Sequence, residues 1–107
     1  MFSLNEISFE EIFPIWNEKL WPGRISKIKP IVNMKYLGGY DSNITKLYHP
    51  KFFGLFHNKK IIGCNSGHGT NNGYRSRGLR IEPKYRNRGL SKLLFMEIEK
   101  QATKEKY

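Results

Sequence analysis

A short apolar strand, a proline, a basic loop with one glycine and a long amphipathic helix follow one another between residues 79 and 104. Pro83 is expected to end the strand, because proline has no N–H group to donate to a sheet. The helix is predicted by apolar residues that recur at helical spacing on one stripe, namely Leu90, Leu93, Leu94, Ile98 and Ala102. This succession restricts the fold more than any other part of the chain, because it places one short loop between a strand and a helix.

The loop reads RNRGLS over residues 86–91 and lies where the helix begins. The first N–H groups of a helix have no partner inside it and carry about half a positive elementary charge, so anions bind there. Gly89 would let the backbone adopt unusual angles and let a phosphate approach the amides. We therefore predict a phosphate cradle from the amides of residues 87–91, with added charge from Arg86, Arg88 and Lys92. The alternative is that Gly89 is only a turn residue and the arginines only solvate a surface loop.

Three consecutive antiparallel strands are expected before this loop. Residues 52–56 and 61–64 are apolar runs joined by a polar turn in which Asn58 can adopt a positive φ, which predicts a β-hairpin. A glycine-rich turn follows the second run. In the third strand, alternation predicts that four residues share one face: Arg75, Arg77, Leu79 and Ile81.

An amphipathic helix is predicted near the N-terminus. Ser8 and Glu11 have the spacing of a capping box, and apolar residues then recur at helical spacing: Phe9, Ile12, Phe13, Trp16 and Leu20. Pro14 removes a hydrogen bond inside this helix and should kink or restart it. A second, short helix is expected around residues 31–37. Three tyrosines in this region either border a pocket or pack while partly exposed: Tyr36, Tyr40 and Tyr48.

The order of strand, proline, aromatic residue, basic loop and helix resembles the acyl-CoA signature of the GNAT superfamily of N-acetyltransferases. That signature reads R/Q-x-x-G-x-G/A after a strand that ends in a V-x-P-like turn. Arg86 and Gly89 match the loop, and Ile81 and Pro83 match the strand end. Ser91 stands where the family usually has Gly or Ala. The hairpin, the third strand and the last helix also follow the family's order, so the resemblance covers almost the whole chain.

The resemblance implies an α/β (α+β) fold in a single GNAT-like domain over residues 1–107. Its expected parts are N-terminal helices, an antiparallel three- to four-stranded sheet and an acyl-CoA-binding helix. The strand that ends at Ile81 would pair through its backbone with the pantetheine arm, and the loop would bind the pyrophosphate. The implied cofactor-binding residues are Leu79, Arg80, Ile81, Arg86, Asn87, Arg88, Gly89, Leu90 and Ser91.

The resemblance also implies an activity: a primary amine attacks the thioester of acetyl-CoA directly, without an acyl-enzyme. This chemistry needs a deprotonated amine, a donor for the developing oxyanion and an acid for the thiolate. Glu82 and His68 are the nearest titratable candidates, and neither is assigned as the base. Because no nucleophilic cysteine is required, Cys64 is expected to be a small core residue.

Members of the family continue beyond this helix, so the domain is expected to be incomplete at its C-terminus. The third strand would then have an open edge that invites another chain. Either a second copy covers this edge, or the sequence is a fragment of a longer protein or a truncated gene product. A catalytically inactive remnant that still binds CoA is one alternative function.

Charge supports a different alternative. Lys and Arg number 19 against 9 for Asp and Glu, which gives a net charge of +10 and suggests an anionic partner. A nucleic-acid-binding module would use Tyr74 and Tyr85 for stacking and a stripe of seven basic residues: Arg75, Arg77, Arg80, Lys84, Arg86, Arg88 and Lys92.

Features that are missing from the sequence predict the localisation of the protein and its metal content. No apolar run approaches the roughly 20 residues that cross a bilayer, and the N-terminus lacks the features of a secretion signal, so a cytoplasmic protein without a membrane partner is expected. A lone cysteine allows no internal disulfide, and the histidines have no ligand spacing, so no metal site is predicted.

Overall fold

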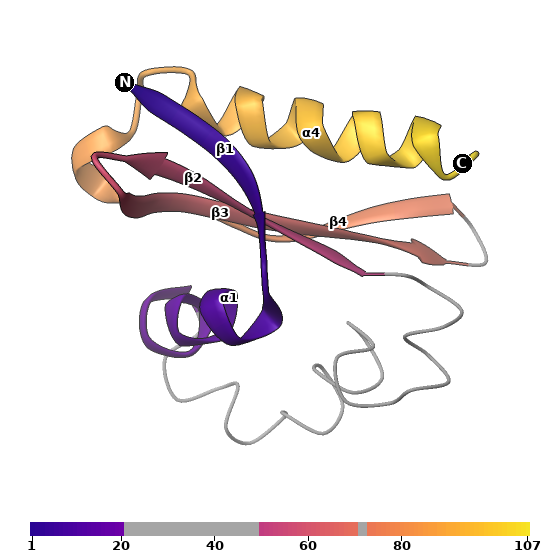
Figure 1. The fold of residues 1–107 in the computed structure, drawn as a ribbon, viewed down its shortest axis with the longest axis horizontal. Helices are drawn as coiled ribbons and strands as arrows, with labels where there is room; N and C mark the ends of the chain where they lie inside the picture. The colour runs from indigo at the N-terminus through magenta and orange to yellow at the C-terminus, as the bar shows by residue number, and fades with distance from the viewer. Residues whose placement is uncertain (21–49, 71–72) are drawn as a thin grey trace.

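The computed structural model describes residues 1–20, 50–70 and 73–107. In these residues a four-stranded antiparallel sheet of order β1-β2-β3-β4 lies between two helical layers (Figure 1). The elements are β1 (Phe2–Ile7), α1 (Phe9–Ile15), the π-helix η1 (Trp16–Leu20), β2 (Lys51–His57), β3 (Lys60–Thr70), β4 (Gly73–Ile81), the 3-10 helix η3 (Pro83–Tyr85) and α4 (Leu90–Lys104). The short helix predicted around residues 31–37 and the three tyrosines near it lie outside the described residues.

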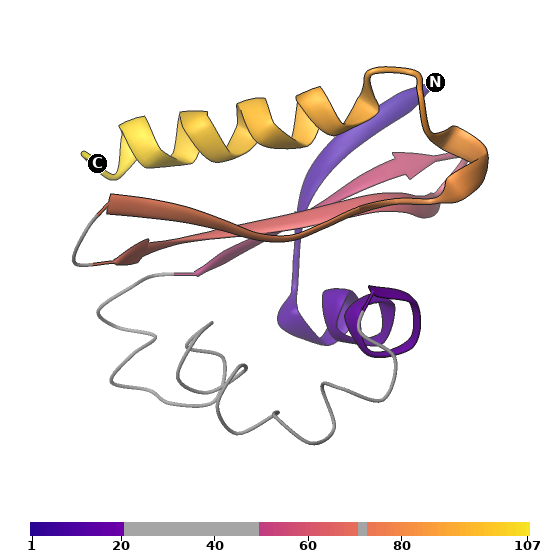
Figure 2. The same ribbon diagram turned by 180° about the vertical axis from the view of Figure 1, so that it is seen from behind.

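Helix α4 lies along one face of the sheet, and α1 lies against the other, as the reverse view in Figure 2 also shows. The α+β architecture, the antiparallel sheet and the long last helix are therefore as predicted. Strand β1, which pairs with β2 from Phe2↔His57 to Ile7↔Phe52, was not among the three strands predicted individually. Within the described sheet, β4 is an edge strand, as expected.

The α1 layer begins at the predicted capping box. The Glu11 N–H donates to Ser8 Oγ at 3.1 Å, and the Ser8 N–H donates to Glu11 Oε1 at 2.9 Å. Helix α1 ends one residue after Pro14, and the chain continues as the π-helix η1, which agrees with the predicted restart. Trp16, the first residue of η1, is fully buried in a cluster with Ile7, Ile12, Phe52 and Cys64.

The predicted hairpin is formed by β2 and β3. Asn58 and Lys59 have φ values of 50° and 67°, so both central residues of the two-residue turn lie in the left-handed region. This conformation matches the twist of the strands that it joins. The positive φ predicted for Asn58 is confirmed.

A β-bulge interrupts β4 at Gly78. Cys64 pairs with Arg80 and Ser66 pairs with Arg77, so one residue of β3 faces two residues of β4. Gly78 has a φ of +82°, a conformation that favours glycine. Bulges of this kind bend a strand and add one residue to its side-chain alternation.

The bulge makes one prediction wrong. Tyr74, before the bulge, packs in the same α4-side cluster as Leu79 and Ile81, after it. Strict alternation would place Tyr74 on the opposite face from those two residues. Arg75 and Arg77 therefore do not share the face of Leu79 and Ile81.

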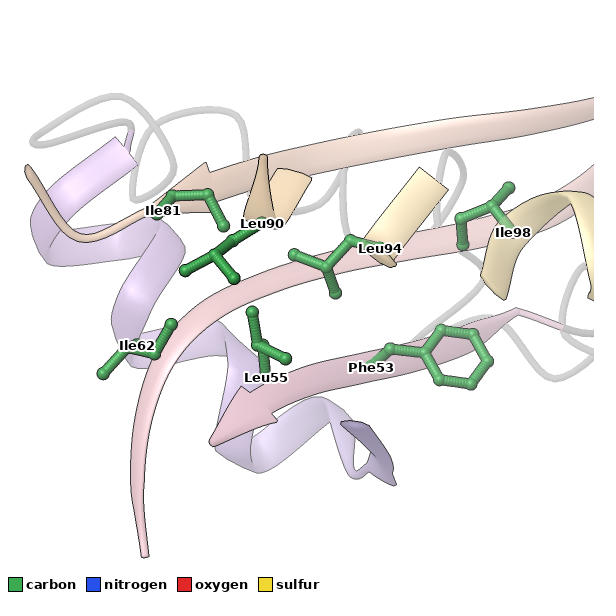
Figure 3. Packing of buried hydrophobic residues seen from close by; sticks show 7 residues of the cluster. All are labelled: Phe53, Leu55, Ile62, Ile81, Leu90, Leu94 and Ile98. Atoms are coloured by element: carbon green, nitrogen blue, oxygen red, sulfur yellow. The ribbon is translucent and has the colours of Figure 1, made fainter. Parts of the chain in front are cut away.

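The core between α4 and the sheet is formed by buried side chains from β2, β3, β4 and α4 (Figure 3). Leu94 at its centre is fully buried. Leu93 departs from the predicted apolar stripe, because 41% of it is exposed. The buried members of the cluster are Phe53, Leu55, Ile62, Ile81, Leu90, Leu94 and Ile98.

Candidate functional site

A pocket of about 460 Å³ lies where the end of β4, the loop after it and the start of α4 meet. Eight of the nine predicted cofactor-binding residues line this pocket, and the exception is Arg88. Arg88 instead lies over the ring of Tyr85, with its Cζ 5.4 Å from the ring centroid. The described lining residues are Leu20, Leu79, Arg80, Ile81, Tyr85, Arg86, Asn87, Gly89, Leu90 and Ser91.

The loop is fixed to the end of β4 by Arg86. Its backbone N–H donates to the Pro83 carbonyl oxygen at 3.2 Å, closing the 3-10 turn η3. Its side-chain Nε donates to the Ile81 carbonyl oxygen at 2.8 Å. Arg86 therefore braces the loop against the strand in addition to placing a positive charge beside the pocket.

Among the described residues, no side chain caps the N-terminus of α4. Gly89 occupies the N-cap position with φ 73° and ψ 14°, and no side chain there accepts a hydrogen bond. In the described part of the chain, none of the backbone hydrogen bonds outside helices and strands is donated by the amides of residues 87–91. Helix α1, by contrast, is capped by Ser8 and Glu11. Such uncapped amides, together with the helix dipole, attract anions.

Apolar side chains from three elements also line the pocket. They are Leu20 of η1, Leu79 and Ile81 of β4 and Leu90 of α4. The edge of β4 runs past these residues, since within the described sheet β4 pairs with β3 alone. The pocket thus combines uncapped amides and basic side chains with apolar side chains beside an edge strand.

Two backbone carbonyls at the β4 bulge are occupied by side chains from the interior. Trp16 Nε1 donates to the Gly78 carbonyl oxygen at 2.9 Å, and Cys64 Sγ lies 3.6 Å from the same oxygen. Ser66 Oγ donates to the Arg77 carbonyl oxygen at 2.6 Å. In a trans peptide the following N–H points away from the carbonyl, so the N–H groups of Gly78 and Leu79 both project away from these donors.

Backbone N–H groups at the edge of a sheet can bind an anion. Trp16, Ser66 and Gly78 are not among the site residues predicted from the sequence. A glycine inside a strand pattern is a signal for a bulge, and Gly78 carries that signal. The approach of Trp16 has no local signal, because the indole comes from 62 residues upstream.

Glu82 is held in an ion-pair cluster at the end of β4. Its Oε1 lies 2.9 Å from Lys19 Nζ and 3.0 Å from Arg80 Nη1. The hydrogen bond from Lys19, with further help from Arg80, holds the pKa of the Glu82 carboxyl below its usual range. Glu82 therefore stays ionised at neutral pH and ties η1 to β4, which does not favour it as a general base.

His68 is buried in β3, with 3% of its surface exposed. Burial, together with the nearby charges of Arg75 and Arg77, lowers the pKa of His68 to about 4. The imidazole is therefore neutral at pH 7. It does not line the pocket described above.

Because of His68, we expect the free energy of unfolding to fall at acidic pH. An unfolded histidine with an ordinary pKa binds a proton as the pH falls below about 6.5, whereas folded His68 resists protonation until about pH 4. The unfolded state therefore gains protons first, and at pH 5 the free energy of unfolding should drop by roughly 2 kcal/mol. Urea unfolding of wild type and His68→Gln at pH 7 and pH 5 checks this. An equal pH dependence in both proteins would contradict it.

Cys64 is fully buried, and burial raises the pKa of its thiol to about 12, so the predicted core role is confirmed.

Among the described residues, no three His, Cys, Asp or Glu side chains are grouped so as to hold a metal ion. The same residues contain no helix that is long and apolar enough to cross a membrane.

The two tyrosines assigned to stacking in the nucleic-acid alternative are engaged within the protein. The Tyr74 hydroxyl donates to Glu105 Oε2 at 3.3 Å, and its ring packs in the α4-side cluster. The Tyr85 ring contacts Phe2 and His57 edge to face, with centroids 6.1 and 5.5 Å away.

Comparisons with known proteins agree on one family. The family model described as the acetyltransferase (GNAT) family matches residues 12–107. No curated protein matches the chain by sequence.

Several solved structures share the fold. An acetyltransferase of the GNAT family from Staphylococcus aureus Mu50 superposes with a TM-score of 0.66 at 17% identity, covering 99% of this chain and 68% of that one. The PaiA N-acetyltransferase of Thermoplasma acidophilum, in complex with coenzyme A, gives 0.59 at 18% identity, covering 98% and 74%. A predicted acetyltransferase of Clostridium acetobutylicum, with acetyl-CoA, gives 0.69 at 11% identity, covering 99% and 76%. The match over residues 12–107 shows that this chain belongs to the acetyltransferase (GNAT) family.

Proposed function

We propose that this chain binds acetyl-CoA in the pocket at the β4–α4 junction and transfers the acetyl group to a primary amine. The observation that carries the proposal is the uncapped N-terminus of α4, which opens onto that pocket next to an edge strand. Two of the structural neighbours are described as complexes with coenzyme A or acetyl-CoA, which supports the same class of ligand here.

The two kinds of lining residue match the two chemical parts of the ligand. The pyrophosphate would accept hydrogen bonds from the amides of residues 87–91, with charge from Arg86, Arg88 and Lys92. The pantetheine arm carries amide groups on an apolar chain, so it can pair with the open edge of β4 at residues 79–81. Ser91 is small enough to let the diphosphate approach, as the usual Gly or Ala does.

The acyl carbonyl would lie at the bulge, where the N–H groups of Gly78 and Leu79 supply donors for the oxyanion. The neutral amine nitrogen attacks the carbonyl carbon and forms the C–N bond. The carbon–sulfur bond then breaks, the thiolate leaves with the electron pair and takes up a proton, and the new amide nitrogen loses one. Donors fixed in advance at such a carbon are worth about 10²–10³ in kcat each. The residues that move the protons are not assigned.

Thermal unfolding with acetyl-CoA tests the proposal. Ligand at about 100 times its Kd should add about 2.7 kcal/mol to the free energy of unfolding, which for a domain of this size raises Tm by roughly 10 °C. The shift should saturate and should persist in moderate salt, because backbone amides provide much of the binding. No shift at millimolar acetyl-CoA would refute the proposal.

Two further measurements separate the rival functions. Binding to single-stranded nucleic acid that falls steeply with salt would favour the basic stripe over the pocket. If acetyl-CoA binds but no amine in a broad panel is acetylated, the chain is an inactive CoA-binding form of the family. The assay for acetyl transfer is the release of the free thiol of CoA.

A further inference from the structure

We propose that Trp16 is a positioning residue for acetyl transfer: its indole N–H fixes the Gly78–Leu79 peptide so that the Leu79 N–H is directed at the acyl carbonyl. The inference rests on the proposed function, because it concerns the acyl end of the same pocket. Trp16 belongs to η1, on the face of the sheet opposite α4. Its role is therefore separate from the roles of the loop and of α4.

The contact between the indole and the bulge is closely fitted. Trp16 is fully buried, and its Nε1 lies 2.9 Å from the Gly78 carbonyl oxygen. A Cβ added to Gly78 would lie 2.4 Å from the indole, and the φ of +82° already disfavours other residues. Position 78 therefore admits only glycine, and the indole rests directly on the peptide backbone.

In this buried environment the indole N–H requires an acceptor, and of its two neighbours the Cys64 sulfur is a weaker acceptor than the Gly78 carbonyl oxygen. Buried N–H donors are almost always paired, and a buried indole N–H is not exposed to water that could replace its acceptor. Aromatic contacts keep the ring in place: the ring centroids of Phe9 and Phe52 lie 6.4 and 6.2 Å from that of Trp16. The second donor to the carbonyl, Cys64 Sγ at 3.6 Å, is a weak one.

The peptide plane transmits this contact to the pocket. Because the peptide is trans, a carbonyl drawn toward Trp16 turns the Leu79 N–H in the opposite direction. Leu79 lines the pocket, and it lies at the bulge, where ladder pairing is interrupted. Without the indole N–H, the peptide can rotate about the flexible Gly78, and the donor for the acyl oxygen loses its fixed direction.

The test compares wild type with Trp16→Phe, which keeps an aromatic ring but removes the N–H. In wild type, the carbonyl stretch of bound [1-13C]acetyl-CoA should lie below its solution value, because a fixed donor polarises the bond. In Trp16→Phe most of this shift should be lost. The preference for acetyl-CoA over CoA in titration calorimetry should fall about fivefold, the equivalent of one net hydrogen bond. Affinity for CoA itself should stay the same.

Ile12→Val is the matched control, because Ile12 is fully buried in the same cluster and donates no side-chain hydrogen bond. It should lower stability and leave both the carbonyl stretch and the acetyl preference unchanged. If Trp16→Phe does not fold, 3-benzothienylalanine installed at position 16 keeps the ring shape and replaces only the N–H by sulfur.

The outcomes are distinct. If wild type fails to bind acetyl-CoA, the proposed function fails and the inference falls with it. If wild type binds and shows the carbonyl shift, but the shift and the acetyl preference are unchanged when the N–H is removed, only the positioning role is wrong. Equal losses of CoA and acetyl-CoA affinity would also overturn it, since they would indicate a merely structural role.

Discussion

Replacing Gly89 with valine is expected to abolish the stabilisation of this protein by acetyl-CoA. Gly89 has a φ of 73° and occupies the N-cap position of α4. A β-branched residue in the left-handed region costs roughly 1–2 kcal/mol, so the loop should relax to a different conformation and turn its amides away. Losing two charge-assisted bonds to a diphosphate, at about 1.5–3 kcal/mol each, weakens binding at least about 100-fold.

The measurement is the ligand-induced change in Tm for Gly89→Val, with Gly73→Val as the matched control. Gly73 also has a positive φ, +132°, and a Cβ added at either position has no other atom within 4 Å. Gly73 does not line the pocket, so Gly73→Val should be less stable than wild type but keep the increase in Tm on adding acetyl-CoA. A normal shift in Gly89→Val would show that the diphosphate does not bind at this loop.

Truncating Leu94 to alanine should give the largest loss of stability among substitutions in α4. Leu94 is fully buried at the centre of the cluster that joins α4 to three strands, where Figure 3 shows it between Leu90 and Ile98. Removal of a buried leucine side chain leaves a cavity and costs about 2–5 kcal/mol. Denaturant unfolding should show a lower midpoint with an unchanged m value.

Leu93→Ala provides the comparison within the same turn of the helix. Leu93 is 41% exposed, so its truncation should change the free energy of unfolding by only about 0.5 kcal/mol. Similar losses for the two variants would mean that α4 does not pack in this register. The pair also links stability to the site, because the helix that Leu94 anchors is the one whose first turn borders the pocket.

The elements predicted from the sequence are those whose signals are local. The α1 capping box and the β-turn at Asn58 each depend on residues a few positions apart, and both have the expected geometry. Strand β1 was missed because its alternation is short and two polar residues, Asn5 and Glu6, interrupt it before Ile7. Pairing with β2 makes it a strand, and that partner lies about fifty residues away in the sequence.

The loop at residues 86–91 was chosen as a site from its glycine, its arginines and its place before a helix. The structure adds facts that this pattern does not contain. The side chain of Arg86 is tied back to the Ile81 carbonyl, and Arg88 lies over Tyr85 outside the pocket lining. Both arrangements depend on where the strand end and the ring are placed, so neither can be read from the loop alone.

The sequence alone determined the family, the nature of the final strand, loop and helix, and the apolar stripe that holds that helix to the sheet. Backbone propensity, proline and capping act over a few residues, which is why these features can be read directly. Only the tertiary structure decided the bulge at Gly78, the faces of Arg75 and Arg77, and the approach of Trp16 to the edge strand. These depend on one extra residue in the pairing of two strands and on a contact across 62 positions, and no local pattern encodes either.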